Sequence, residues 1–375
     1  MKPVGIGIIG TNWGTLVQLP AFRVAGLNVV AVAGRNPEKT RRTADQLAVP
    51  FATTDWRRLV TCDNVTLVSI VTPPSTHCEM ALAALEAGKH VLCEKPMALH
   101  VGEARAMVQA ASTRPAQLTL VDHELRFLPA LQAARQMVIE GAIGQFRRAE
   151  VRAIASVRAN LRQPWNWWSD AAQGGGVLGT ISTHQIDLLR YLLNDEVASA
   201  QGFLTTFITE RPRDKSGQLT SANLRSVTAD DFATFHLRFK RGGVAVVIAS
   251  MVARVEEPQS LTLHGDEGSL RFIDGQLLYA RFDEEFRDVT PPHSITFPRW
   301  FEGLRHSSFT CFAEATVYLA HALRTALEGN PNALTSAATF RDGLCVQQVV
   351  DAVRLSSAHS GDWVEIGNDP DGSHQ

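Results

Sequence analysis

The first third of the chain alternates short apolar runs with helical patterns. Residues 4–10 (VGIGIIG) contain no charged or amide side chain, which is typical of a strand buried on both faces of a parallel sheet. Two helix ends are marked: Asn36-Pro37 suits a helix start and Gly88 a helix end. Strands joined by helices require right-handed crossovers, so the pattern predicts a doubly wound parallel sheet. Further buried strands are expected at 29–33, 65–71, 90–93 and 117–121.

From about residue 123 the pattern changes. After a helix at 129–140, apolar and polar positions alternate in longer segments joined by glycine-containing turns, which predicts a mostly antiparallel sheet. The polar stretch 210–225 is expected to be an exposed loop and the tail 367–375 to be frayed. The expected strands are 146–155, 203–208, 231–239, 244–252 and 260–264, and the closing helices are 309–327 and 338–355.

These patterns predict an α/β protein with two domains. Residues 1–122 form a dinucleotide-binding domain, and residues 123–375 form an α+β domain with a large open sheet that binds substrate and mediates oligomerisation. A length of 375 residues agrees with two domains, since one domain has about 150 residues.

Composition narrows the class of protein. The net charge of −2 argues against binding to nucleic acid or membranes through bulk charge. No apolar run reaches the roughly 18 residues of a membrane helix, and the start is too short for a signal peptide. The 5 cysteines are scattered without a CxxC pair, which favours a reduced cytoplasmic setting over disulfides or a zinc site. We therefore expect a soluble cytoplasmic protein without a metal.

The first expected strand ends in a candidate dinucleotide-binding turn, formed by Gly10, Thr11, Asn12, Trp13 and Gly14. Glycines at such a turn let the backbone approach a pyrophosphate, and the following helix supplies amide donors. The GxGxxG pattern is imperfect, because Asn12 stands at the second glycine position and Thr15 at the third. Asn tolerates left-handed backbone better than other residues, so the turn can survive. A purely structural tight turn is the alternative.

The end of the second expected strand bears on the choice of cofactor. NAD-preferring sites usually place an acidic residue there, whereas an arginine accommodates the 2′-phosphate of NADP. Here the strand ends in Gly34-Arg35, and the following positions add Lys39, Arg41 and Arg42. The sequence therefore favours NADP over NAD, unless Arg35 is simply a solvated surface charge.

Further motifs carry a resemblance to a known family. Thr72-Pro73-Pro74 with His77 follows the third of these strands, and Glu94-Lys95-Pro96 follows the fourth. Together they resemble the glucose–fructose oxidoreductase, inositol dehydrogenase and rhizopine-catabolism family (Gfo/Idh/MocA). The resemblance covers nearly the whole chain and continues through 126–129, 141–144, 174–179, 184–187, 342–344 and 351–356.

The resemblance implies a Rossmann domain followed by an α/β domain whose open sheet often forms dimers or tetramers. It implies hydride transfer between NAD(P) and a sugar, cyclitol or related polyol, or its ketone. In this sequence Glu94 would contact the nicotinamide-side ribose, and Thr72, Pro73 and His77 would line the cofactor groove. Lys95 would lie beside the nicotinamide and the reacting carbon–oxygen bond, where an ammonium stabilises negative charge on oxygen.

A polar stripe is expected on the helix that follows the glycines at 174–176. Thr180, His184 and Asp187 fall at i, i+4 and i+7 between apolar positions, which suggests the wall of a cleft. His184 is the candidate general acid and base, and Asp187 a residue that orients its ring. Alternatively His184 is a buried histidine satisfied by Asp187. Family enzymes carry an aspartate where this chain has Thr180, and threonine cannot hold negative charge.

Other residues are candidates for substrate binding. Trp168 lies in an aromatic stretch that suits the C–H faces of a sugar, although such residues more often serve a core or an interface. His123 and Glu124 follow the expected strand at 117–121 and are possible replacements for the missing aspartate. Arg126 either clamps a substrate carboxylate or forms a salt bridge at the domain junction.

The sequence therefore predicts an NADP-linked, or alternatively NAD-linked, oxidoreductase of carbohydrate-like alcohols or ketones that forms a homo-oligomer. Lys95 and His184 are expected to work in a cleft between the two domains. Two alternatives remain open: a dinucleotide-binding sensor without turnover, and a glycoside hydrolase that uses NAD transiently. The identity of the substrate and the direction of the reaction are not predicted.

Overall fold

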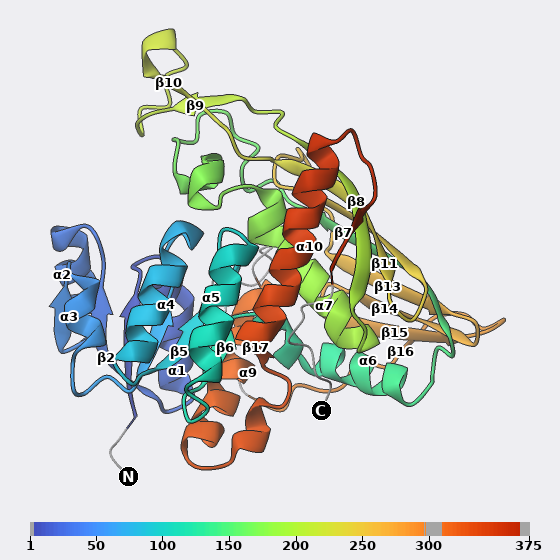
Figure 1. Ribbon diagram of the computed structural model, residues 1–375, viewed down its shortest axis with the longest axis horizontal. Coiled ribbons are helices and arrows are strands. Elements are labelled where there is room, and N and C mark those ends of the chain that lie inside the picture. Colours follow the sequence, from blue (N-terminus) through green and yellow to red (C-terminus); the bar gives the residue numbers. More distant parts are fainter. Residues whose placement is uncertain (1–3, 296, 298–309, 368–375) are drawn as a thin grey trace. The chain divides into compact units, whose positions relative to one another are not determined.

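The computed structural model describes residues 4–295, 297 and 310–367. The first sheet has the strand order β17-β6-β5-β4-β1-β2-β3, drawn in blue and cyan in Figure 1 except for β17. All pairs are parallel except the edge strand β17, which is antiparallel to β6. The doubly wound parallel sheet is therefore confirmed. Its strands are β1 (Gly5–Ile9), β2 (Asn28–Ala33), β3 (Phe51–Thr53), β4 (Leu67–Ile70), β5 (His90–Cys93), β6 (Thr119–Val121) and β17 (Ala338–Thr339).

The helices of this part begin and end where local signals place them. The side chain of Asn36 accepts a hydrogen bond of 2.8 Å from the Lys39 amide and caps α2 (Pro37–Gln46), as expected. Gly88 has a φ of +76°, the left-handed conformation expected after α4 (His77–Glu86). The other helical elements are η1 (Gly14–Gln18), α1 (Leu19–Val24), α3 (Trp56–Val60), η2 (Pro74–Thr76), α5 (Val101–Ser112), η3 (Glu124–Phe127), α9 (Thr310–Leu327) and η8 (Pro331–Leu334).

The chain divides into two compact units that are not continuous in sequence. One unit comprises residues 1–132 and 292–344, and the other comprises residues 133–291 and 345–375. The expected second domain, 123–375, therefore differs from the compact unit at both of its ends. The difference arises because α9 packs against α1 and η1, with Val317 and Leu323 in the same apolar core as Phe22, and because β17 pairs with β6. The edge of the first sheet is thus completed by a segment from far along the chain.

The second unit contains a sheet of nine strands in the order β16-β15-β14-β13-β7-β12-β11-β8-β18. Its pairs are antiparallel except for β7 and β12, so the mostly antiparallel sheet is confirmed. The strands are β7 (Phe146–Ile154), β8 (Val197–Thr205), β11 (Phe232–Phe239), β12 (Val244–Ser250), β13 (Ser260–Gly265), β14 (Gly268–Ile273), β15 (Gln276–Arg281), β16 (Arg287–Asp288) and β18 (Val364–Glu365). Its helical elements include η4 (Trp167–Ser169), η5 (Ala171–Gln173), η6 (Leu178–Ser182) and α7 (Thr183–Leu193), and α6 (Pro129–Ile139) and α10 (Phe340–Ala358) cross the boundary of the units.

Alternation along the strands sorts the two faces of this sheet. On β11, Phe235, Leu237 and Phe239 are buried, while His236 and Arg238 between them are exposed. Because successive side chains of a strand point to opposite faces, one face packs into the core and the other carries polar and charged groups. The expected strand at 203–208 is shifted, since β8 ends at Thr205.

The expectation of an exposed loop at 210–225 is wrong at its start. Strand β9 (Glu210–Pro212) pairs with β10 (Leu224–Ser226), and Arg211 is only 2% exposed. The Arg211 guanidinium donates to the backbone oxygens of Asn160 and Arg158, so it fastens this segment to the chain that follows β7. Hydrogen bonding to carbonyls, which a sequence does not show, allows this arginine to be buried.

No helix among the described residues is long and apolar enough to cross a membrane.

Candidate active site

The strand order of the first sheet reverses between β1 and β4. In open α/β sheets such a switch point is where ligands bind, outside the carboxyl ends of the strands. Gly10 follows β1 there, Thr72 follows β4, Glu94 follows β5 and Asp122 follows β6. The topology therefore gathers the candidate cofactor residues of this unit, and Lys95, at one edge of one sheet.

The turn after β1 has the backbone that a dinucleotide requires. Gly10 has a φ of +134°, and a Cβ there would lie 2.1 Å from the Val71 carbonyl oxygen. A Cβ at Gly14 would lie 2.7 Å from Ile8 Cγ2, so glycine lets η1 pack closely on β1. Asn12, at the tip, is exposed, and its carbonyl accepts the amides of Thr15 and Leu16. These residues fit a bound pyrophosphate, with Thr11 beside them and Trp13 packed against Val17 and Ala313.

Two cations stand near this turn. Lys39 Nζ donates to Asn12 Oδ1 at 2.6 Å, which brings the ammonium of α2 to the tip of the turn. A Cβ at Gly34 would lie 2.6 Å from Thr11 Cγ2, so the end of β2 also approaches closely. Arg35 directly follows Gly34 and is exposed. The end of β2 thus offers positive charge, with no carboxylate in the Gly34–Asn36 segment.

His77 lies inside the protein and connects two of the strand-end segments. Its ring nitrogens contact the carbonyl oxygens of Thr72 at 2.8 Å and Pro96 at 2.9 Å, and the side chain is fully buried. Burial is the main reason why its pKa falls from 6.5 to about 4, so the ring is neutral at physiological pH. A neutral ring has a single N–H, so His77 donates to one of these two carbonyl oxygens and lies, fully buried, between the Thr72-Pro73 segment and Pro96.

Two carboxyl groups, those of Glu94 and Asp122, lie at the end of β5. Asp122 is fully buried and Glu94 is partly buried. Burial raises the pKa of Asp122 to about 6, and burial together with the negative charge of Asp122 raises the pKa of Glu94 well above its usual range. The positive charge of Lys95 opposes both shifts. Lys95 is thus a cation beside acidic groups at the carboxyl end of β5.

The segment after β6 contributes three further buried side chains. His123, Glu124 and Arg126 are 3%, 2% and 5% exposed. Arg126 Nη2 lies 2.9 Å from Asp342 Oδ1, which agrees with the salt-bridge alternative rather than with a substrate clamp. Both residues belong to the first unit. Burial, and then the charges of Asp122 and Glu94, raise the pKa of Glu124 well above its usual range.

In the second unit, the expected polar stripe is present in sequence but not on a regular helix. Residues 178–182 form a turn of π-helix, so Thr180 does not keep the α-helical spacing to His184. The Thr180 hydroxyl donates to the Gly176 carbonyl at 2.6 Å. His184 and Asp187 are 2% and 1% exposed, on a helix whose every residue is buried. Asp187 Oδ1 lies 3.9 Å from Arg190 Nη1, an ionic partner that the sequence analysis did not consider.

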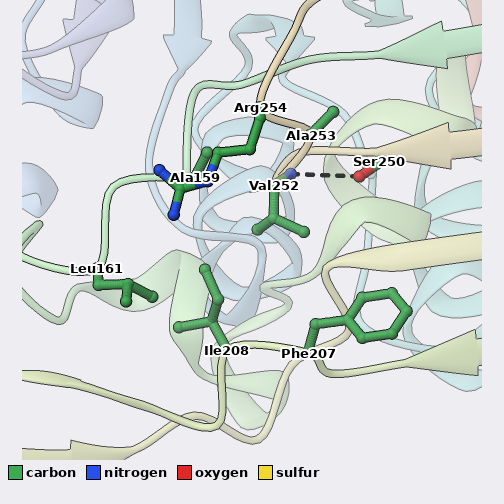
Figure 2. Close-up of a pocket in the computed structure, with 8 residues that line it drawn as sticks. All are labelled: Ala159, Leu161, Phe207, Ile208, Ser250, Val252, Ala253 and Arg254. Carbon is green, nitrogen blue, oxygen red and sulfur yellow. Dashed lines mark hydrogen bonds between the residues drawn. The ribbon is translucent and has the colours of Figure 1, made fainter.

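Trp168 lies in η4, with its ring 5.5 Å from that of Trp167. It borders a small cavity together with Arg158, Ser169 and Arg211. Burial, and then the charge of Arg211, lower the pKa of Arg158 to about 10, so Arg158 stays charged. A larger open pocket of about 340 Å³ lies in the same unit, lined mainly by apolar side chains such as Leu161, Phe207 and Ile208 (Figure 2). None of the expected site residues lines that pocket.

Sequence reasoning missed several buried polar residues of the site. Gln18, Ser69 and Asp122 are all fully buried around the strand ends of the first sheet. The one available signal was Asp122, a carboxyl group directly after an apolar strand and next to His123. Gln18 and Ser69 are polar residues within apolar segments, and only the fold shows that they meet.

Comparison with known proteins agrees with this geometry. Residues 4–122 match the oxidoreductase family with an NAD-binding Rossmann fold, and residues 131–271 match the GFO/IDH/MocA C-terminal domain. The chain belongs to the Gfo/Idh/MocA oxidoreductase family. Its relatives include glucose-fructose oxidoreductase domain-containing protein 2 of Xenopus laevis, which is 30% identical over 99% of this chain and 96% of that protein.

Solved structures extend this family assignment to the whole fold. An oxidoreductase domain protein from Kribbella flavida is 31% identical with a TM-score of 0.84, over 98% of this chain and 100% of that one. Levoglucosan dehydrogenase in complex with NADH and L-sorbose is 26% identical with a TM-score of 0.84, over the same shares. The expected family, and with it the NAD-binding Rossmann domain, is therefore confirmed.

Proposed function

We propose that this protein is an NAD(P)-dependent dehydrogenase or reductase that transfers a hydride between the nicotinamide and a sugar, a cyclitol or a related polyol, or the corresponding ketone. The observation that carries the proposal is Lys95 at the carboxyl end of β5, between Glu94 and the cis peptide to Pro96, on the sheet edge that also bears the turn of Gly10 and Gly14. A dehydrogenase of the same family that was crystallised with NADH and levoglucosan supports the substrate class.

The chemistry assigns a separate task to each side chain. When bound, the nicotinamide ring supplies the acceptor or donor of the hydride. The ammonium of Lys95 stabilises the negative charge that builds on the substrate oxygen. In the oxidation, the imidazole of His184 accepts the hydroxyl proton, and in the reduction it returns that proton. Asp187 orients the ring of His184, and its carboxylate also lies 3.9 Å from the guanidinium of Arg190.

The remaining candidates bind or position. Glu94 contacts the ribose on the nicotinamide side, and Thr72 and Pro73 line the groove for the cofactor. The Thr180 hydroxyl donates its hydrogen to the Gly176 carbonyl. Its oxygen can therefore only accept a hydrogen bond from a substrate hydroxyl. His123 and Trp168 add polar and aromatic contacts to the sugar. Arg126 is occupied by Asp342, so its contribution is to hold the segment after β6 in place.

The cofactor is NADP in preference to NAD. Arg35 is exposed at the end of β2 and Lys39 reaches the tip of the turn, so two cations are available to a 2′-phosphate. Replacing Arg35 by alanine is expected to weaken NADPH binding about tenfold and to leave NADH binding unchanged, because about 1.4 kcal/mol of charge-assisted binding corresponds to that factor. Equal losses for both cofactors would contradict the preference.

The protein forms a homo-oligomer through the open face of the second sheet. That face carries Phe203 and Val244, which are 50% and 47% exposed, beside polar groups, and a sheet face of this kind suits self-association. Analytical ultracentrifugation is expected to show a dimer or tetramer, and a monomer at micromolar concentration would contradict this part of the proposal. The proposed location is the cytoplasm.

Nicotinamide absorbance tests the proposed function. The protein is mixed with NADP or NAD and a panel of sugars and polyols, including levoglucosan, and with NADPH or NADH and the corresponding ketones. Net change of absorbance with at least one compound supports the dehydrogenase. Release of product from a glycoside without net change indicates the hydrolase instead. Tight cofactor binding with neither outcome indicates a sensor, an alternative that the threonine at position 180 permits.

A further inference from the structure

A buried hydrogen-bond network connects the dinucleotide turn with the end of β5. Gln18 lies at the end of η1, the helix that starts at Gly14. Its Nε2 donates to Asp122 Oδ2 at 2.6 Å and to Glu94 Oε1 at 3.2 Å. One amide group therefore bridges two carboxyl groups that follow neighbouring parallel strands.

The orientation of the Gln18 amide is fixed from its other side. The hydroxyl of Ser69, on β4, donates to Gln18 Oε1 at 2.6 Å, so the oxygen of the amide faces Ser69 and its nitrogen faces the acids. Gln18 and Ser69 are both fully buried. An amide that is held at both ends cannot rotate away without leaving polar atoms unsatisfied, which is costly in a protein interior.

The network also reaches the backbone of the candidate catalytic residue. The amide N–H of Lys95 donates to Glu94 Oε2 at 3.2 Å. Both Glu94 oxygens are thus occupied, one by Gln18 and one by the residue whose side chain is proposed to act on the substrate. A change in the position or charge of the Glu94 carboxylate therefore alters the hydrogen bond made by the backbone of Lys95.

The bridge from Gln18 places the two acids side by side. One amide nitrogen donates to an oxygen of each carboxyl group, so Glu94 and Asp122 lie next to each other, and a hydrogen bond between two carboxyl groups requires that one of them is protonated. Asp122 Oδ1 is buried and accepts no hydrogen bond from another described residue. Two neighbouring carboxyl groups in a buried site cannot both ionise easily, because their negative charges repel each other. The surrounding charged or titratable groups are Lys95, Glu124 and the thiol of Cys93.

We propose that Gln18 and Asp122 are positioning residues that hold Glu94 in a proton-sharing carboxyl pair, and that the charge of this pair controls cofactor binding and the setting of Lys95. The inference deepens the proposed function and rests on it. A dinucleotide held by Glu94 would exclude water from the pair, which would make its second ionisation harder. Loss of the shared proton therefore opposes binding of the anionic cofactor.

Titration of the protein with NADH at a series of pH values tests the proposal. Ionisation of Asp122 at about pH 6 leaves one proton on the pair, and as pH rises further and Glu94 loses that proton, the dissociation constant is expected to rise about tenfold, since one unit of pKa difference between free and bound protein is a factor of ten. In Asp122→Asn, the negative charge of Asp122 no longer opposes the ionisation of Glu94, so this rise becomes much smaller. A wild-type protein with a flat profile, or Asp122→Asn with an unchanged rise, would overturn the proposal.

Glu124→Gln is the matched control. Glu124 is another buried carboxyl group, and its charge interacts with both members of the pair. Its removal is expected to shift the rise in pH and to keep its size, because the bridge from Gln18 remains. Gln18→Leu, which removes the bridge, is expected to weaken NADH binding at every pH. A rise that vanishes in Glu124→Gln and persists in Asp122→Asn would assign the shared proton elsewhere and overturn the proposal.

Infrared spectroscopy of the protein without cofactor separates this proposal from the proposed function. In the difference between the spectra of the wild type and Asp122→Asn near neutral pH, the carbonyl stretch of a protonated carboxyl group is expected, whereas the band of Glu124, whose pKa is also raised, is common to both proteins and cancels. If that variant does not fold, the pH titration of the band in the wild type decides, and its absence at about pH 6 would overturn the pair. If NADH does not bind but the band is present, the proposed function fails while the proton-sharing pair stands.

Discussion

The two regions that carry the candidate chemistry differ in how they accommodate buried charge. At the strand ends of the first sheet, Glu94 and Asp122 lie close together, and burial raises the pKa of both. On α7 of the second unit, Asp187 is equally buried, but the Arg190 guanidinium is 3.9 Å away and also binds Glu196 at 2.7 Å. The strand-end region therefore holds a proton on its pair of acids, whereas α7 pairs a carboxylate with an arginine.

The difference shows which region is adapted to change its protonation state. An ion pair resists titration, because removing either charge leaves the other buried and uncompensated. A carboxyl pair with a raised pKa can gain or lose a proton near neutral pH at smaller cost. The strand-end region therefore responds to pH, whereas the paired charges of α7 provide a fixed frame.

Replacement of His184 is expected to have the largest effect. His184→Gln removes the acid and base but keeps a polar side chain, so kcat is expected to fall about 10²- to 10⁴-fold, the usual contribution of general acid–base catalysis. The dissociation constant for NADH is expected to stay constant. Steady-state kinetics and fluorescence titration measure the two quantities. His236→Gln, at an exposed position on β11, is the control. If kcat of the His184 variant equals that of this control, α7 has only a structural role.

Replacement of Arg190 tests the fixed frame. Arg190→Ala removes a buried guanidinium that lies 3.9 Å from Asp187 and binds Glu196 at 2.7 Å, and is expected to lower the free energy of unfolding by more than about 1 kcal/mol. Denaturant unfolding measures the loss. Arg152→Ala, at an exposed pair with Glu257, is the control and is expected to cost less than about 1 kcal/mol. Similar values for both variants would show that α7 does not depend on charge pairing.

Much of the fold could be predicted from the sequence, because it follows from local patterns. Continuous apolar runs identified five parallel strands, and alternation identified most strands of the second sheet. Strand β3 has only three residues, too few to show a pattern, whereas β14 alternates in burial and was nevertheless not predicted, nor was β15. The partition of the chain was missed because β17 pairs with β6 across more than half the sequence.

The site was predictable to a lesser degree, for a physical reason. Motif residues such as Glu94 and Lys95 lie at strand ends, where the topology determines their place. The partners that set their protonation come from other elements: Gln18 from η1, Ser69 from β4 and Asp122 from the end of β6. Likewise the spacing of Thr180 to His184 assumed an α-helix, and the π-helical turn at 178–182 depends on packing rather than on sequence period.

The buried His77 in the first region is expected to have a smaller effect, on the pH dependence of stability. Its pKa is lowered from 6.5 to about 4, so its stabilisation is fully present above pH 6.5 and is lost as pH falls toward 4. This difference corresponds to about 3 kcal/mol at most, since each unit is worth about 1.4 kcal/mol. His77→Gln is expected to lose that part of the acid dependence of stability.

The comparison of wild type and His77→Gln by thermal unfolding at a series of pH values isolates the effect of His77. The raised pKa of Asp122, about 6, acts in the opposite sense, because its contribution is lost as pH rises through that value. The contribution of Asp122 is common to both proteins and cancels in the difference. An acid dependence that is identical in the two proteins would contradict the neutral, buried state of His77.

The most direct measurement of the central claim is kcat together with the dissociation constant for the cofactor in Lys95→Ala. If the ammonium at the end of β5 stabilises charge on the substrate oxygen, kcat falls about 10²- to 10³-fold, and cofactor binding, which depends on the turn after β1, stays within about threefold. A variant that turns over the substrate at the rate of the wild-type protein, or one that loses cofactor binding and turnover in parallel, would contradict the account.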